Sequence, residues 1–264
     1  MSTTPEGRVD SLLDRMRALE DAVADLASRL TGLERRLVSA KDGRFAALYP
    51  AFEDRFRGSE SDITGKLAVY LPDVDRLAAT GGVLDIGPGR GEWLGMLRDR
   101  GVRAYGVDAN AGFVARCRAK GLDVRQDDAV AHLRGLTPGS LDLVTAFHVI
   151  EHLDIEELLE LVEAAHHALR AGGALLVETP NPTNLVMGAC DFYNDPTHRS
   201  PLPPALIDHL FTAIGFAPVE VRHVNPPPGA PEPGTVSDPL HALLAQRLLG
   251  PQDYAVLGFR PDEG

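Results

Sequence analysis

Residues 83–94 read VLDIGPGRGEWL, an apolar segment that runs into three glycines spaced two residues apart. The apolar run predicts a buried strand over 83–86, and the residues after the turn predict a helix over 92–99. Glycines at such a turn let the backbone approach a ligand closely and adopt positive φ angles that other residues avoid. The turn alone is a weak signal, because dinucleotide-binding folds and many ordinary strand-to-helix turns share it.

Predicted strands and helices alternate along residues 81–264, which is typical of a parallel sheet covered by helices on both faces. The predicted strands are 83–86, 104–107, a short one beginning at Val124, 141–146, 174–178, 218–223 and 254–259, and the predicted helices are 92–99, 111–120, 129–133, 155–170 and 204–214. The proline-rich run NPPPGAPEPG before the last strand predicts a surface loop, because proline cannot pair inside a sheet.

The N-terminal part of the chain has a different pattern. Apolar residues recur at alternating steps of three and four from Val9 to Leu37, with arginines at g positions and glutamates at the following e positions. This pattern predicts a coiled-coil helix over residues 1–40 that pairs in a homodimer. The alternative is an amphipathic helix packed on its own domain, although such a helix usually has a wider apolar stripe. Residues 41–80 mix aromatic, charged and turn residues and predict a helical cap.

The charge and cysteine content exclude some classes of protein. The 264 residues include 26 Lys and Arg against 38 Asp and Glu, a net charge of −12, which disfavours nucleic acid as a partner. Two cysteines, Cys117 and Cys190, are too few for a disulfide framework. The sequence lacks an apolar run long enough for a membrane span and a signal-peptide pattern. We expect a cytoplasmic protein without membrane insertion.

Acidic residues follow the next two predicted strands. Asp108 ends the second strand about 20 residues after the glycines, where a carboxylate can accept hydrogen bonds from ribose hydroxyls. Asp127 or Asp128 ends the third strand, where either could meet an adenine amino group. Three signals in this order indicate a nucleotide-type cofactor rather than an ordinary turn.

Together these motifs resemble the class I S-adenosylmethionine-dependent methyltransferases, over residues 80–185. The glycine spacing differs from that of dinucleotide oxidoreductases, which leave two residues before the third glycine. The resemblance implies a Rossmann-like α/β fold with a seven-stranded, mostly parallel sheet, and S-adenosylmethionine as the cofactor. It implies cofactor-binding roles for Arg57, Asp85, Gly87, Gly89, Gly91, Asp108, Ala109, Asp127, Asp128 and Ala129.

The fourth predicted strand ends in TAFHVIEHL, which places three groups able to bind a metal at His148, Glu151 and His152. They share a face if the segment is helical, and His198 follows in a long connection after the fifth strand. The set resembles the divalent-metal site of small-RNA 2′-O-methyltransferases and related O-methyltransferases, which implies Glu151, His152 and His198 as ligands and Mg²⁺ as the metal. Those enzymes carry glutamate at the position of His148, so His148 is either a ligand or a catalytic base. The simpler alternative is that His152 caps a helix and His198 orders a loop.

The run ETPNPTNLVMGACDFYNDPTHRSPLPPALIDHLFTAIGF, residues 178–216, with FEDRFRGSESDI and YLP earlier in the chain, resembles bacterial polysaccharide-associated methyltransferases. Within that group it is most similar to the methylmannose polysaccharide 1-O-methyltransferases. The resemblance implies a saccharide acceptor, the 1-hydroxyl of short 3-O-methylated mannosides. Asn181, Tyr193 and Asp195 are the predicted substrate-binding residues. Methylation of an RNA 2′-hydroxyl, a quinone or a phenol, and a non-catalytic cofactor-binding scaffold, are the alternatives.

Overall fold

The structure is a computed structural model that describes residues 43–78, 82–231, 234–235 and 237–262. The predicted heptad helix and its pairing lie outside these residues and remain predictions. Residues from Asp54 onward form one unit, which holds the sheet and the site. The helices ahead of the sheet are α2 (Gly43–Phe56), α3 (Glu60–Leu67), η1 (Ala68–Tyr70) and α4 (Leu71–Leu77).

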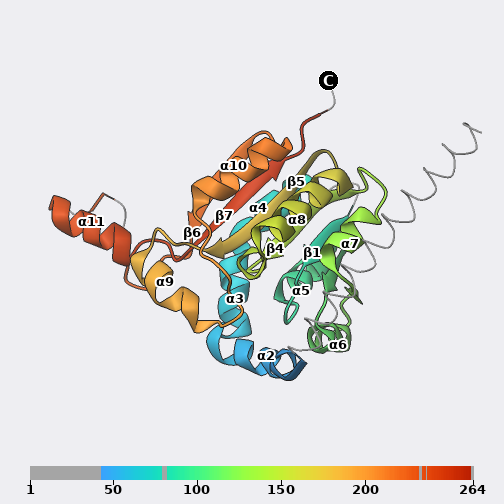
Figure 1. The fold of residues 1–264 in the computed structure, drawn as a ribbon, viewed down its shortest axis with the longest axis horizontal. Helices are drawn as coiled ribbons and strands as arrows, with labels where there is room; N and C mark the ends of the chain where they lie inside the picture. The colour runs from blue at the N-terminus through green and yellow to red at the C-terminus, as the bar shows by residue number, and fades with distance from the viewer. Residues whose placement is uncertain (1–42, 79–81, 232–233, 236, 263–264) are drawn as a thin grey trace, which may run out of the picture. The chain divides into compact units, whose positions relative to one another are not determined.

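A seven-stranded sheet with the order β3-β2-β1-β4-β5-β7-β6 forms the centre of this unit (Figure 1). The strands are β1 (Val83–Ile86), β2 (Ala104–Asp108), β3 (Val124–Gln126), β4 (Leu141–Phe147), β5 (Leu169–Pro180), β6 (Val219–Val224) and β7 (Asp253–Phe259). The first five strands are parallel, and β7 runs antiparallel between β5 and β6. The predicted seven-stranded, mostly parallel sheet is therefore confirmed. The strand order reverses between β1 and β4, where open α/β sheets bind their ligands.

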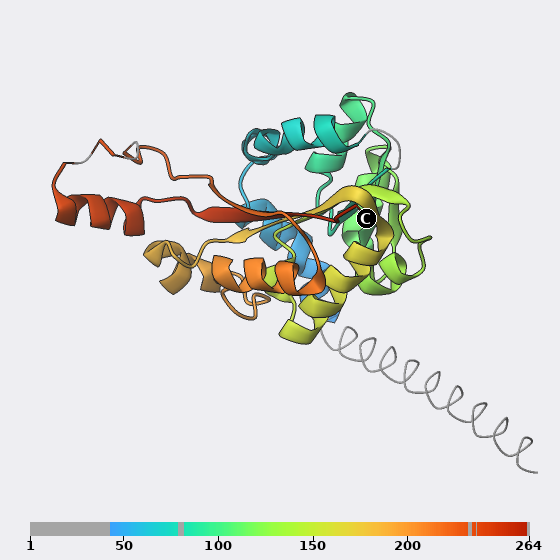
Figure 2. The same ribbon diagram turned by 90° about the horizontal axis from the view of Figure 1, so that it is seen from above.

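Helices cover both faces of the sheet (Figure 2). One face packs against α7 (Ala129–Arg134), α8 (Ile155–Ala168) and α10 (Pro204–Ile214), and the other against α3, η1, α4 and α5 (Glu92–Asp99). Neighbouring strand residues point to opposite faces, so Leu84 belongs to the first core and Val83 to the second. A smaller third cluster packs α6 (Ala111–Ala119) near β3. Burial on both faces explains why the central strands β1, β4 and β5 are mostly apolar.

The fifth strand begins earlier than predicted. The sequence predicted a helix through residue 170, but α8 ends at Ala168 and β5 starts at Leu169. Leu169 pairs with Leu141 across a register shift, and Arg170 Nε donates to Asp142 Oδ1 at 2.5 Å. These long-range contacts hold residues 169 and 170 in the sheet and override their local helical tendency.

Four short elements were not predicted: η2 (Ile150–His152), α9 (Leu185–Ala189), η3 (Asp191–Asn194) and α11 (Pro239–Leu248). The described part of the proline-rich run 225–234 has no helix or strand, as expected. After it, Asp238 caps α11 by accepting a hydrogen bond from the His241 amide. Helix α11 lies beyond the N-terminal end of β7 (Figures 1 and 2). None of the helices in the described ranges is long and apolar enough to cross a membrane.

Candidate functional site

The glycine turn after β1 has a shape that only glycine permits. Gly87, Gly89 and Gly91 have φ angles of +63°, +54° and +85°, which other residues rarely adopt. A Cβ on Gly87 would lie 2.7 Å from Val149 Cγ2, and one on Gly91 would lie 2.5 Å from Leu122 Cδ1. The turn therefore packs directly against the segment that follows β4, which brings the two predicted motifs together.

Asp85 is a buried acid at this turn. Its side chain is 2% exposed, and its Oδ1 accepts a hydrogen bond from Thr145 Oγ1 at 2.7 Å. Burial raises the pKa of Asp85 to about 7, although the Thr145 bond and the positive charge of Arg57 act in the opposite direction. A cationic ligand would stabilise the ionised form, so the position suits a group that carries an ammonium.

The acids after β2 and β3 lie at the same edge of the sheet as the glycine turn. Asp108 Oδ1 accepts the Asn110 amide at 2.7 Å, and the exposed Ala109 lies between them. Asp127 Oδ1 accepts the Asp128 amide at 2.9 Å. Asp128 is the N-cap of α7, which begins at Ala129. Asp127 Oδ2 lies 3.3 Å from His132 Nδ1, so both acids have partners in the protein, and half of the Asp127 side chain stays exposed toward a ligand.

His148 follows β4 and lies among carboxylates. Its φ of +56° is unusual for a residue other than glycine, and its Nδ1 and Nε2 lie 3.1 Å from Glu151 Oε1 and 3.2 Å from Glu178 Oε1. Burial lowers the pKa of His148, but the hydrogen bonds to Glu151 and Glu178 outweigh it and raise the pKa to about 10. A ring that stays protonated near neutral pH is a poor proton acceptor, so this geometry does not favour the predicted base role.

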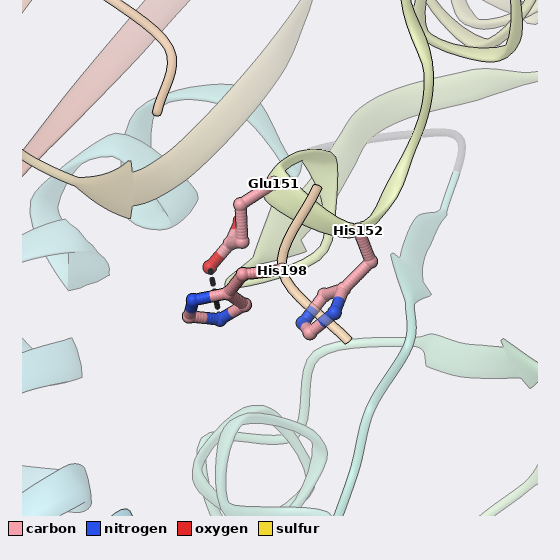
Figure 3. Close-up of side chains that lie close together, drawn as sticks. All are labelled: Glu151, His152 and His198. Carbon is pink, nitrogen blue, oxygen red and sulfur yellow. Dashed lines mark ion pairs between the residues drawn. The ribbon is translucent and has the colours of Figure 1, made fainter. Parts of the chain in front are cut away.

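The three predicted metal ligands come together (Figure 3). One ligand atom from each of Glu151, His152 and His198 lies within 4.8 Å of the other two. Glu151 is 1% exposed, and its Oε2 accepts from Thr179 Oγ1 at 2.9 Å. Burial raises the pKa of Glu151, but His148 lowers it to about 2. Glu151 is therefore an ionised carboxylate at neutral pH.

Hydrogen bonds hold both imidazoles in one tautomer. His198 Nδ1 lies 2.6 Å from the Phe192 carbonyl, which can only accept, so Nδ1 carries the hydrogen. Thr197 Oγ1 donates to Asp195 Oδ1 at 2.6 Å and lies 2.8 Å from His152 Nδ1. Because its one hydrogen goes to the carboxylate, the hydroxyl accepts from His152 Nδ1. Each ring therefore has its lone pair on Nε2, as in metal sites with a fixed second shell.

The predicted substrate residues have different roles. Asn181 is 2% exposed; its Oδ1 accepts from the Thr183 amide and hydroxyl, and its Nδ2 donates to the Pro251 carbonyl. These bonds occupy the polar atoms of the Asn181 side chain and fix the turn after β5. A side chain that is bonded in this way is not suited to bind a substrate. Asp195 acts through Thr197 on His152. Tyr193 is 63% exposed, and its role remains a prediction.

The sequence did not identify several residues of the site. Tyr70 in the helical cap donates its hydroxyl hydrogen to Glu178 Oε2. Asp253 lies at the start of β7, and its Oδ1 is 3.9 Å from His148 Nε2. Glu178 ends a predicted strand, and this position at the carboxyl end of the sheet could have identified it as a site residue. Nothing in the local pattern around Tyr70 or Asp253 indicates a site, because only the fold brings them to His148.

Comparison with known proteins agrees with this geometry. A family described as a methyltransferase domain matches residues 60–221. A probable S-adenosylmethionine-dependent methyltransferase of Mycolicibacterium smegmatis is 34% identical over 136 residues, and the match spans about half of each chain, 51% of both.

Solved structures give the same result. The crystal structure of a SAM-dependent methyltransferase from Archaeoglobus fulgidus has a TM-score of 0.71 at 32% identity, covering 80% of this chain and 99% of that one. The phosphoethanolamine N-methyltransferase 2 of Haemonchus contortus, in complex with S-adenosyl-L-methionine, shares the fold with a TM-score of 0.54 at 16% identity, covering 81% of this chain and 60% of that one. The glycine turn, the acids along the sheet edge and these matches lead to one conclusion: the chain belongs to the methyltransferase-domain family and is a class I S-adenosylmethionine-dependent methyltransferase.

Proposed function

We propose that this methyltransferase is an O-methyltransferase that methylates a saccharide hydroxyl with the help of a divalent cation bound by Glu151, His152 and His198. The observation that carries the proposal is the preset geometry of these three side chains. A buried, ionised carboxylate faces two imidazoles whose hydrogen bonds leave the lone pair on Nε2. The segment packs against the glycine turn through Val149.

The cofactor side of the site fits an amino-acid and nucleoside ligand. When bound, S-adenosylmethionine supplies an electrophilic methyl group on a cationic sulfonium. Asp85 is placed to favour an ammonium group, because a positive charge would offset its burial. Asp108 and Asp127, at the ends of β2 and β3, are placed to accept hydrogen bonds from ribose and adenine groups. Arg57, whose charge acts on Asp85, is placed to pair with a carboxylate.

The metal side of the site has one oxygen and two nitrogen donors. Two imidazoles favour Mn²⁺ or Zn²⁺, whereas Mg²⁺ prefers a shell of oxygens, so the donor set differs from that expected for Mg²⁺. A divalent cation at these residues would act as a Lewis acid toward an acceptor hydroxyl. A cation there would make that hydroxyl more acidic, so that its proton could leave to solvent without His148 as the base. His148 holds Glu151 in place through its Nδ1–H.

The acceptor assignment rests on the resemblance of residues 178–216 to polysaccharide-associated methyltransferases. That stretch contributes His198 and Thr197 to the cation site. The ring of Tyr193 packs edge-on against Phe192, whose ring in turn contacts His198, and an exposed aromatic ring is suited to the apolar face of a sugar. The net charge of −12 disfavours an RNA acceptor. We propose the 1-hydroxyl of a short 3-O-methylated mannoside as the acceptor.

The test is production of S-adenosylhomocysteine by the purified full-length protein with short mannosides, with and without a 3-O-methyl group. Each reaction is repeated after EDTA treatment and after addition of Mn²⁺, Zn²⁺ or Mg²⁺. We expect turnover that depends on the 3-O-methyl group, is abolished by EDTA and is restored best by Mn²⁺ or Zn²⁺. Turnover that EDTA does not change would contradict the metal. Turnover on an RNA or a phenol, with none on mannosides, would contradict the acceptor.

A further inference from the structure

A second group of possible metal ligands lies next to the first. His148 Nε2, a carboxylate oxygen of Glu178 and a carboxylate oxygen of Asp253 lie within 4.8 Å of one another. They come from the ends of β4 and β5 and from the start of the antiparallel β7. The Glu178 and Asp253 side chains are 2% and 4% exposed, whereas that of His148 is 31% exposed. His148 is therefore the most exposed of the three side chains.

The two oxygens of Asp253 have different surroundings. Oδ2 accepts from Asn225 Nδ2 at 2.9 Å and lies 3.7 Å from Lys66 Nζ. Oδ1 faces His148 Nε2 at 3.9 Å, beyond hydrogen-bond distance. Two carboxylates of nearly buried side chains that face the same histidine nitrogen favour a positively charged ligand between them.

An ion pair alone does not balance this cluster. The carboxylates of Glu151, Glu178 and Asp253 surround His148, and Lys66 lies beside Asp253. One hydrogen on Nε2 cannot serve Glu178 and Asp253 together, because the nearer oxygen takes it.

The separations of the ligand atoms suit a small divalent cation. Bonds of about 2.0–2.2 Å place neighbouring ligand atoms about 3.0–3.6 Å apart. The observed separations from His148 Nε2 are 3.2 Å to Glu178 and 3.9 Å to Asp253, and the two carboxylate oxygens lie within 4.8 Å of each other, so a bound cation would draw the carboxylates closer together. The other ring nitrogen, Nδ1, lies 3.1 Å from Glu151 Oε1. A hydrogen held there fixes the ring so that Nε2 faces the two carboxylates, and a cation bound between them would displace the Nε2 hydrogen.

We propose that His148, Glu178 and Asp253 bind a second divalent cation, linked to the first site by the His148–Glu151 hydrogen bond. This goes beyond the proposed function and does not require its first site. The donor set of one imidazole and two carboxylates suits Mn²⁺ or Zn²⁺. Tyr70 and Asn225 hold the two carboxylates from outside the cluster. Because the cluster opens beside His148, a cation here can also bind an oxygen of the acceptor.

The experiment measures how many Mn²⁺ ions bind to the full-length protein after removal of metals, using the electron paramagnetic resonance signal of free Mn²⁺ during titration. We expect two ions per wild-type chain. Asp253→Asn and, separately, Glu178→Gln should each retain one ion and weaken the other at least tenfold. His152→Gln with His198→Gln should remove the other ion instead. Glu160→Gln, which changes a carboxylate paired with Arg134 on the surface, is the control and should retain both.

The outcomes separate the two proposals. One ion in the wild type that the Asp253 and Glu178 variants do not affect would overturn the second site and leave the first. One ion that is lost only in those variants would support the second site and contradict the metal assignment of the proposed function. No bound ion would overturn both. Circular dichroism and thermal melting of each variant show whether it is folded before its ions are counted. If Asp253→Asn does not fold, Glu178→Gln tests the second site in its place.

Discussion

Replacement of Gly91 by alanine tests the packing of the glycine turn. The residue has a φ of +85°, and a Cβ there would lie 2.5 Å from Leu122 Cδ1 and 3.0 Å from Cys117 Sγ. The left-handed backbone costs an alanine about 1–2 kcal/mol, and the overpacking adds about 1–3 kcal/mol. We therefore expect Gly91→Ala to lower the free energy of unfolding by about 2–5 kcal/mol.

Gly121 provides the matched control. Its φ of +73° is similar, but a Cβ there would meet nothing within 4 Å, so Gly121→Ala should lose only the backbone part, about 1–2 kcal/mol. Urea unfolding of both variants can be followed by the fluorescence of Trp93, the single tryptophan of the chain, which is 2% exposed. Equal losses in the two variants would refute the claim that the turn is closed against α6 and Leu122.

Three further predictions concern charge, the turn after β5 and the second shell of the metal site. Without cofactor, Asp85→Asn should change the pH dependence of stability. Burial raises the Asp85 pKa from 3.8 to about 7, so the free energy of unfolding of the wild type falls by up to about 4 kcal/mol as the pH rises through this window. Urea unfolding at pH 4.5 and at pH 8 should show this fall in the wild type and no such fall in the variant. Asn181→Ala should lower the free energy of unfolding by about 1–3 kcal/mol with an unchanged KM for the acceptor, and a raised KM with unchanged stability would restore its substrate role. Thr197→Val should weaken Mn²⁺ binding about 10–100-fold without changing cofactor affinity in calorimetry, whereas His209→Gln, on the exposed side of α10, should change neither.

Local patterns were sufficient for the elements around the cofactor turn. The strand Val83–Ile86 and the helices Glu92–Asp99 and Pro204–Ile214 were predicted with the bounds that the structure shows. Each is a short apolar run or an amphipathic stretch bounded by glycine or proline, so the local signal and the tertiary contacts agree. The start of β5 at Leu169 was missed because its pairing with Leu141 is a long-range contact.

The candidate site divides in the same way. Glu151, His152 and His198 could be selected from the sequence because two of them are neighbours after a strand and the third lies in a polar connection. The role of His148 could not be judged from the sequence, because two of the three carboxylates that act on it, Glu178 and Asp253, come from β5 and β7. A pattern of residues shows which groups can titrate, but their surroundings decide in which direction they shift.

The most direct test of the account is a crystal of the full-length protein grown with S-adenosylhomocysteine and Mn²⁺, with an anomalous difference map calculated at the manganese edge. The account predicts the cofactor product at the glycine turn beside Asp85 and Asp108, with an anomalous peak bounded by Glu151, His152 and His198. Cofactor density elsewhere, or an ordered site in which these three side chains hold no manganese, would contradict it.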